Sequence, residues 1–320
     1  MKISILNHLK RSNGFVSGEE ISRTLKVSRT AIWKYIKQLR DDGFVIEAIS
    51  HRGYRLVSEP DKLFPDSIQA GLKTNIFGKK IVYFDSVGST MDMASKMALE
   101  GASEGTVVCA ESQTKGRGRL GRDWVSPKGQ GIYFSAILRP AIALSEASGL
   151  TLVIAVAVCE AIRAATGLRA MIKWPNDILY QQKKVAGILT ELSAETDRIN
   201  FIILGVGVNV YGAMPSFLKD AVSLEKAAPR IISRVALFQE ILRQMEKYYG
   251  LFLKEGLAAV ADTWRSLSST LNTQVRVVEF NKTTEGLAVD IDSQGALLIK
   301  EKNGKIVRKV SGDVIHIRAK

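Results

Sequence analysis

The sequence predicts an α+β protein built from more than one domain. Three observations predict this class: the first segment reads as helices followed by a hairpin, the middle mixes strand and helix patterns irregularly, and the last segment reads as short strands. A chain of 320 residues with 46% hydrophobic residues can bury the cores of two or three domains.

The charge and the cysteines limit the class of function. A formal net charge of +13 favours polyanionic partners, although charge alone does not choose between DNA, a nucleotide and solvent. The two cysteines lie inside apolar runs and far apart, which is typical of a reducing compartment. The first ten residues lack the apolar run of a signal peptide, and no window approaches the apolar length of a membrane span. We therefore expect a cytoplasmic protein with no membrane partner.

Residues 1–62 read as a winged helix-turn-helix. Ser17 and Glu20 have the spacing of a capping box at the start of one helix, and Ser28 can cap the next. Two short extended segments follow, at 44–48 and 54–57, with a turn between them that indicates a hairpin. This order of elements predicts an N-terminal DNA-binding domain over residues 1–62.

The helix that begins after Ser28 presents polar and cationic side chains on the faces that do not carry its apolar stripe. Such a surface suits the major groove, with Arg29, Thr30 and Trp33 as base readers. The predicted DNA-contacting residues are Ser28, Arg29, Thr30, Trp33, Lys34, Lys37, Arg40 and Arg52. A small helical interaction domain with a solvated basic face is the alternative.

The segment Gly116 to Arg122 alternates glycine with arginine and predicts a cradle for a strong anion. Glycines let backbone N–H groups approach a ligand, and each guanidinium presents a planar fork that matches phosphate or carboxylate oxygens. A flexible Arg-Gly-Gly tail that binds nucleic acid is the alternative. The run is short and lies between two strand-like runs, which favours a loop in a folded domain.

Three further motifs lie in a central domain that we expect over residues 76–270. Small hydroxylated residues at 86–90 precede a helix, residues 173–177 read Lys-Trp-Pro-Asn-Asp, and residues 183–187 bring a lysine into a strand. An ordinary helix cap, a turn with a core tryptophan, and solvated hairpin lysines are the alternative interpretations. None of the three motifs is specific alone.

Together these motifs, with Gly205 to Asn209, resemble those of biotin protein ligases in their order along the chain. With the N-terminal helix-turn-helix, the whole chain resembles the bifunctional ligases that also repress the biotin operon. Two positions depart from the family pattern: Met91 stands where the family often has asparagine, and Leu120 replaces a frequently basic residue.

The resemblance implies a fold and a reaction. The central domain is expected to be a mixed α/β ligase domain of the class II synthetase-like, biotin/lipoate ligase type, and residues 273–320 a small Src-homology-3-like β-barrel. Such enzymes use ATP and Mg²⁺ to convert biotin into biotinyl-5′-AMP and then transfer biotin to a lysine of a biotin carboxyl carrier protein. Biotinyl-5′-AMP also acts as corepressor for a homodimer on operator DNA.

The resemblance also implies roles for individual residues. Substrate binding is expected from Ser89, Thr90, Met91, Gln113, Arg117, Gly118, Arg119 and Lys184. Catalysis is expected from Arg119, Asp177 and Lys184. The loop that closes over the adenylate is expected to involve Gly116, Gly121, Arg122, Trp124, Asn176 and Asn209. The histidines and cysteines have no metal-site spacing, so Mg²⁺ is expected only with Asp177.

Two alternatives to this function stay open. A lipoate-type ligase performs the same acyl-adenylate chemistry, but the winged helix and the glycine-arginine loop argue against it. A transcription regulator whose ligand-sensing domain has lost catalysis would not need to retain Arg117, Arg119 and Lys184.

Overall fold

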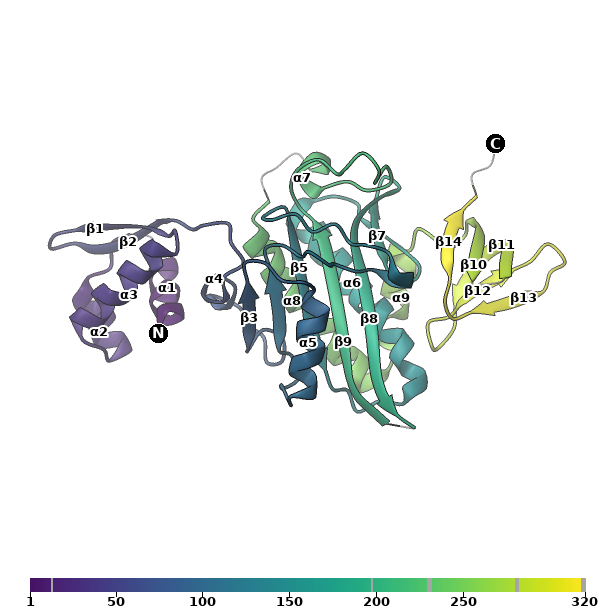
Figure 1. The fold of residues 1–320 in the computed structure, drawn as a ribbon, viewed down its shortest axis with the longest axis horizontal. Helices are drawn as coiled ribbons and strands as arrows, with labels where there is room; N and C mark the ends of the chain where they lie inside the picture. The colour runs from purple at the N-terminus through teal and green to yellow at the C-terminus, as the bar shows by residue number, and fades with distance from the viewer. Residues whose placement is uncertain (13, 197, 229–231, 280–281, 318–320) are drawn as a thin grey trace.

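The computed structural model describes residues 1–12, 14–196, 198–228, 232–279 and 282–317. Three bodies follow one another along the long axis of the molecule (Figure 1). The N-terminal helices lie at one end, a large sheet with its covering helices occupies the middle, and a small all-β body lies at the other end.

The N-terminal body contains α1 (Lys2–Arg11), α2 (Gly18–Leu25), α3 (Arg29–Asp41), and the antiparallel hairpin β1 (Val45–Ile49) and β2 (Gly53–Ser58). The expected caps are present: the Ser17 side chain accepts a hydrogen bond from the Glu20 N–H, and Ser28 accepts one from Ala31. Apolar residues from all three helices, including Ile5 and Ile32, form a separate core. The winged helix-turn-helix expected from the sequence is confirmed.

In the described part of the chain, a central sheet of seven strands runs in the order β3-β4-β5-β9-β8-β7-β6. Its strands are β3 (Ile81–Phe84), β4 (Val107–Ala110), β5 (Gly131–Leu138), β6 (Met171–Lys173), β7 (Asp177–Tyr180), β8 (Lys183–Glu195) and β9 (Arg198–Asn209). β3 and β4 are parallel and the other neighbours are antiparallel. The mixed sheet agrees with the predicted α+β class and excludes a repeating βαβ fold.

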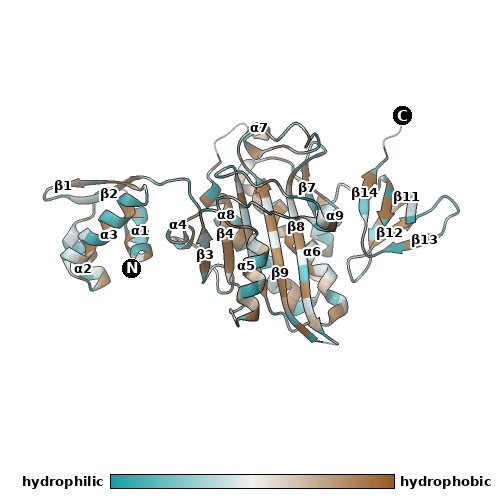
Figure 2. Ribbon diagram, in the orientation of Figure 1, coloured by the Kyte–Doolittle hydropathy of each residue, from teal (hydrophilic) through white to brown (hydrophobic). Residues whose placement is uncertain are grey.

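Helices cover the sheet unequally. One face carries α6 (Ala147–Thr166), α8 (Arg234–Glu255) and α9 (Ala258–Leu267), while α5 (Thr90–Leu99) packs on the other (Figure 1). Short helices α4 (Pro65–Gln69) and α7 (Leu224–Ala227) lie in connections, as do the 3₁₀ turns η1 (Arg119–Gly121) and η2 (Leu144–Glu146). Figure 2 shows hydrophobic residues along the central strands and on the faces of α6 and α8 that meet them.

The segment Leu144–Thr166 corrects one expectation. It is long and apolar enough to cross a membrane by length and composition, whereas the sequence was expected to hold no window of that kind. Within the structure 72% of its apolar window is buried, because α6 packs between the sheet and α8. The apolar length therefore reflects a helix at the centre of the protein core.

The C-terminal body is the predicted small β module. In the described residues, five strands run in the order β13-β12-β11-β10-β14, formed by β10 (Gln274–Glu279), β11 (Lys282–Ile291), β12 (Leu297–Lys300), β13 (Ile306–Lys309) and β14 (Asp313–His316). Residues 318–320, the end of the expected 273–320 domain, lie outside the described residues. Trp174 ties this body to the sheet, because its buried indole N–H donates to the Gly295 carbonyl at 3.0 Å.

Candidate active site and DNA-binding surface

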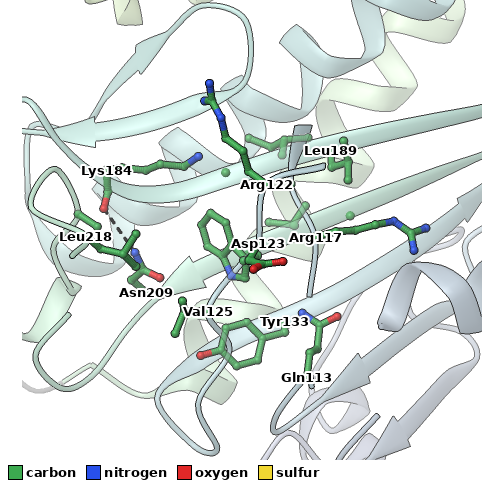
Figure 3. Close-up of a pocket in the computed structure, with 18 of the residues that line it drawn as sticks. Gln113, Arg117, Arg122, Asp123, Val125, Tyr133, Lys184, Leu189, Asn209 and Leu218 are labelled. Carbon is green, nitrogen blue, oxygen red and sulfur yellow. Dashed lines mark hydrogen bonds between the residues drawn. The ribbon is translucent and has the colours of Figure 1, made fainter. Parts of the chain in front are cut away.

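A cavity of about 500 Å³ opens where β5, β8 and β9 meet the loop at 112–130 (Figure 3). Most of the predicted ligand residues line it, although they come from segments far apart in the chain. The lining includes Ser89, Thr90, Met91, Gln113, Arg117, Gly118, Arg119, Arg122, Trp124, Asn176, Asp177, Lys184 and Asn209. Of the residues expected there, Gly116 and Gly121 do not line it.

A fixed polar group forms one end of the cavity. Gln113 accepts hydrogen bonds at its side-chain oxygen from the Thr90 backbone N–H at 2.8 Å and from the Thr90 hydroxyl at 3.0 Å. Its amide nitrogen donates to Ser126 Oγ at 3.0 Å. Ser89 caps α5 by accepting from Met91 N–H, so the cap and the ligand-facing residues belong to one turn. Buried amides and hydroxyls held in this way suit a ligand with several polar atoms.

The glycine-arginine loop is a compact turn. Gly118 N–H donates to the Arg122 carbonyl, and Trp124 N–H donates to Gly116. A Cβ at Gly116 would lie 2.5 Å from the Trp124 carbonyl oxygen, so glycine is required there for close approach of the two backbone segments. Leu120 occupies a left-handed conformation, with φ of 56°, at the exposed tip of the turn.

The three arginines of this loop all contact protein groups. The Arg117 guanidinium points away from the cavity, where its Nε and Nη2 donate to the Glu191 carboxylate at 3.1 and 3.0 Å and its Nη1 donates to Asp92 (Figure 3). Glu191 and then Asp92 raise the pKa of Arg117, against the opposing effect of burial. The Arg117 side chain therefore anchors the loop to α5 and β8, while its backbone faces the cavity.

Arg119 and Arg122 reach the C-terminal body. Arg119 donates to the Asn176 side-chain oxygen at 3.1 Å and to the Gly312 carbonyl at 3.3 Å, and Arg122 donates to Asp313. Burial lowers the pKa of Arg119, with Asp313 acting in the opposite direction. A partly buried guanidinium beside an open cavity is suited to neutralise an incoming anion.

A lysine and a carboxylate form the opposite end of the cavity from Gln113. Lys184 Nζ lies 2.6 Å from Asp177 Oδ1, and the two side chains are 30% and 24% exposed. The same ammonium lies 5.1 Å from the centroid of the Trp124 ring, on the side of the cavity that this indole closes. Asn209 donates to the Lys184 carbonyl at 3.4 Å and so holds the start of β8.

Gly187 and Gly207 are site residues to which the sequence analysis assigned no individual role. A Cβ at Gly187 would lie 3.0 Å from Trp124 Cζ3, and one at Gly207 would overlap the same indole. The two glycines face each other across β8 and β9 and make a flat surface on which the Trp124 ring lies. Glycine inside a strand often marks such close approach, and this signal was available in both motifs.

No cluster of three His, Cys, Asp or Glu side chains able to hold a metal ion occurs among the described residues. Among the described residues, the carboxylates that line the cavity belong to Asp123, Asp177 and Asp313, and Asp177 would hold Mg²⁺ together with phosphate oxygens of a nucleotide. Mg²⁺ is commonly held by one or two carboxylates together with substrate phosphates, so the donor set fits this ion.

The N-terminal body exposes most of the predicted DNA-contacting residues on one helix. Trp33 is 58% exposed, and Arg29, Thr30, Lys34 and Lys37 are exposed beside it. Arg29 pairs with Glu19 at 2.7 Å on the surface, where ionic contacts exchange readily with those to phosphate.

The remaining three predicted contacts have structural partners. The Ser28 hydroxyl caps α3, and Arg40 donates to the Ile46 carbonyl at 3.0 Å through Nε and at 2.6 Å through Nη2. On the hairpin, the Arg52 guanidinium lies 4.7 Å from the centroid of the Phe15 ring, which presents it at the tip. Arg40 therefore supports the hairpin, and both Arg40 and Arg52 are exposed.

These features define a class: a DNA-binding winged helix joined to an enzyme domain whose cavity suits a ligand with anionic and polar ends. Comparison with family models gives the same division. Residues 2–55 match the HTH domain, residues 83–209 the Biotin/lipoate A/B protein ligase family, and residues 270–317 the Biotin protein ligase C terminal domain.

Known proteins resemble the chain over almost its full length. It is 43% identical over 307 residues to the bifunctional ligase/repressor BirA of Bacillus subtilis (strain 168), covering 94% of each chain. It is 33% identical over 312 residues to the BirA of Escherichia coli (strain K12), covering 95% of this chain and 94% of the relative. The structure of the Aquifex aeolicus biotin protein ligase in complex with biotin and ATP matches with a TM-score of 0.66 and 30% identity, over 75% of this chain and 100% of that one. The chain belongs to the family of bifunctional biotin ligase/repressor proteins.

Proposed function

We propose that the chain is an ATP-dependent biotin–protein ligase that uses the cavity beneath the 112–130 loop, and that it represses transcription in response to its own reaction intermediate. The observation that carries this proposal is the pairing, in one cavity of about 500 Å³, of a polar end at Gln113 with a cationic end at Lys184. Biotin has the same polarity, with a ureido ring at one end and a carboxylate at the other.

The two ends assign the orientation of biotin. Thr90 and Gln113 face the ureido group, the Trp124 indole and the glycine surface of β8 and β9 contact the fused rings, and Lys184 receives the carboxylate. Flat apolar walls with a few fixed polar groups are typical of sites for small ligands. The Aquifex aeolicus relative, described with biotin and ATP bound, supports placing both substrates here.

The first step joins two anions. A biotin carboxylate oxygen attacks the α-phosphorus of ATP, the bond to the pyrophosphate oxygen breaks, and biotinyl-5′-AMP and pyrophosphate result. Lys184 neutralises the carboxylate and the α-phosphate as they meet, and Arg119 stabilises the negative charge that develops on the phosphoryl and leaving oxygens. Asp177 would hold Mg²⁺, which would supply positive charge to neutralise the phosphate oxygens.

The second step transfers biotin to a biotin carboxyl carrier protein. The acceptor lysine amine attacks the acyl carbon of biotinyl-5′-AMP, and the bond to the AMP oxygen breaks. Asn176 and Asp177 lie at the same end of the cavity as Lys184 and orient the incoming amine. The contacts of Arg119 and Arg122 with Gly312 and Asp313 support a role for the C-terminal barrel beside this opening.

Repression assigns the winged helix to operator DNA. In this proposal α3 enters the major groove and the hairpin contacts the flanking backbone, with a homodimer placing two such helices on a palindromic operator. Biotinyl-5′-AMP, by ordering the loop, favours that dimer. Both cysteines are buried as free thiols, which agrees with the expected cytoplasmic location. Residues 1–62, 76–270 and 273–320 are the corresponding functional domains.

The ligase activity is tested by incubating the full chain with ATP, Mg²⁺ and a biotin carboxyl carrier fragment, with either biotin or lipoate added. Mass spectrometry of the carrier then reports the adduct. A mass increase of one biotin supports the proposal, and a lipoyl adduct assigns the chain to lipoate ligation. An unmodified carrier indicates that the chain is a ligand-sensing regulator without catalytic activity. A gel shift on biotin-operon DNA with and without biotinyl-5′-AMP tests the repressor.

A further inference from the structure

Arg234 is a buried cation that the proposed reaction does not use. It is the first residue of α8, its side chain is 2% exposed, and it is absent from the described residues that line the cavity. Burying a guanidinium is costly unless its donors are paired, so its partners indicate what it holds together.

The first set of partners lies in the linker between the two larger bodies. Arg234 donates through its backbone N–H to Asp61 Oδ1 and through Nε to Asp61 Oδ2, each at 3.1 Å, and through Nη2 to the Asp61 carbonyl. Asp61 lies between β2 of the winged helix and α4 of the enzyme domain, and its side chain is 37% exposed. A groove lined by α1, β2, the linker and α8 adjoins this point.

The second set of partners lies at the ends of two strands of the active-site sheet. Arg234 Nη1 donates to Glu111 Oε2 at 2.8 Å and to the Gly131 carbonyl at 3.1 Å. Glu111 directly follows β4, and Gly131 begins β5. Two residues further along the chain from each of them are Gln113, in the loop after β4, and Tyr133, within β5, and both line the cavity (Figure 3).

The linker reaches the same cluster a second time. The Leu63 N–H donates to Glu111 Oε1 at 2.8 Å, so one carboxylate oxygen of Glu111 accepts a hydrogen bond from the linker and the other accepts one from Arg234. Burial by itself lowers the pKa of Arg234, but the charges of Glu111 and Asp61 outweigh it and raise the pKa. The Arg234 guanidinium therefore stays charged, and a shift of the linker acts on Glu111 and on Gly131 through this one rigid group.

We propose that Arg234 is a positioning residue for biotin binding, which couples the position of the 59–63 linker to the placement of Gln113 and Tyr133 in the cavity. This inference rests on the proposed function, since it concerns the ligand of that same site. Displacing the linker from Arg234 weakens biotin binding although Asp61 lies outside the cavity. By reciprocity, bound biotin strengthens the hold on the linker and hence on the winged helix.

The test is the affinity of the full chain for biotin, measured by titration calorimetry without ATP. Asp61→Asn keeps the shape of the linker side chain and removes its charge, and we expect biotin to bind about five- to tenfold more weakly, within the range usual for coupled sites. In steady-state assays the KM for biotin rises by the same factor, while kcat at saturating biotin stays within about twofold, since Asp61 touches no reacting atom.

Glu246→Gln is the matched control. Glu246 lies on the same helix and also anchors a distant backbone segment, accepting hydrogen bonds from the N–H groups of Asn75, Ile76 and Phe77. Among the described residues it makes no hydrogen bond or ion pair with the strand ends at the cavity. We expect this variant to lower the melting temperature and leave biotin affinity unchanged. Arg234→Lys, which keeps the charge but cannot bridge both carboxylates, should match Asp61→Asn in affinity.

Three outcomes decide the matter. Parental biotin affinity in Asp61→Asn overturns the inference, and so does an equal loss of affinity in Glu246→Gln, because that loss would follow from destabilisation alone. A loss confined to Asp61→Asn and Arg234→Lys supports it. Failure of the parent chain to bind biotin contradicts the proposed function itself, and the parent titration reveals this separately.

Discussion

Lys184→Met is the most direct perturbation of the proposed first step. The substitution keeps the length and apolar stem of the side chain and removes only the ammonium. In the structure this ammonium is the cation 2.6 Å from Asp177, at the end of the cavity assigned to the biotin carboxylate and the α-phosphate. We expect the rate of adenylate formation to fall sharply while biotin affinity falls much less, since the charge matters most when the two anions meet.

The size of the effect follows from the burial of the pair. The Lys184 and Asp177 side chains are 30% and 24% exposed, so an effective dielectric constant of about 20 is appropriate at this end of the cavity. At that dielectric constant the Lys184 ammonium and a substrate anion about 4 Å away attract each other by about 4 kcal/mol. Losing about 3 to 4 kcal/mol of transition-state stabilisation slows a step by roughly 10²- to 10³-fold.

The assay is a single-turnover reaction with α-labelled ATP, excess enzyme and saturating biotin, quenched and resolved for biotinyl-5′-AMP. Lys183→Met is the control, because Lys183 is an exposed lysine next to Lys184 on β8 that does not line the described cavity. We expect the control to react within about twofold of the parent. Adenylate formation by Lys184→Met within about fivefold of the parent would refute the role assigned to Lys184.

Three further predictions concern the loop, its tryptophan and the barrel. Gly207→Ala places a methyl group against Trp124 and should displace the indole. The change in tryptophan fluorescence on adding biotin should then be lost, and biotin should bind about tenfold or more weakly. A fluorescence titration identical to that of the parent would contradict the contact. Arg119→Gly removes the link from the loop to Asn176 and Gly312 and should raise release of free biotinyl-5′-AMP about tenfold or more, measured against the parent by chromatography. Burial, aided by the charge of Lys173, lowers the pKa of His316 from 6.5, so the unfolded chain binds this proton before the folded chain does, and stability falls as the pH drops below about 6.5. Between about pH 7 and pH 5, the melting temperature of His316→Asn should therefore fall less than that of the parent. Equal falls in the two proteins would exclude the effect.

The N-terminal elements were predictable because their signals are local. The hydroxyls of Ser17 and Ser28 cap helices within three residues of themselves, and the hairpin turn follows the second helix directly. The central class was also predictable from the irregular mixing of patterns, but the short strands β6 and β7 were not. Each has only three or four residues, and Ile172, Trp174 and Ile178 of this hairpin belong to the main core, so tertiary packing supports strands whose local signal is weak.

In the site, the sequence identified which residues gather but not what their side chains contact. Arg117 was assigned to the ligand, whereas its guanidinium meets Asp92 and Glu191, 25 and 74 residues away in the chain. The partners of Arg234 lie 173 and 123 residues away, so no motif contains them. Motif spacing therefore predicts the chemistry of a segment, whereas the ionic partners of its side chains depend on which distant segments the folded protein brings together.

These long-range contacts bear on how the site can signal. Each loop arginine already holds a protein group: Arg117 holds α5 and β8, Arg119 holds Asn176 and the barrel, and Arg122 holds the barrel. When Arg119 neutralises an anionic ligand it therefore exchanges its present partners for the ligand, and the net free energy of binding is smaller than that of the new contact alone. An exchange of this kind is readily reversed when the intermediate is consumed by the carrier protein. In the proposed function, the same loop protects the reactive anhydride and reports its presence to α5, to the barrel and, through Glu111 and Arg234, to the linker.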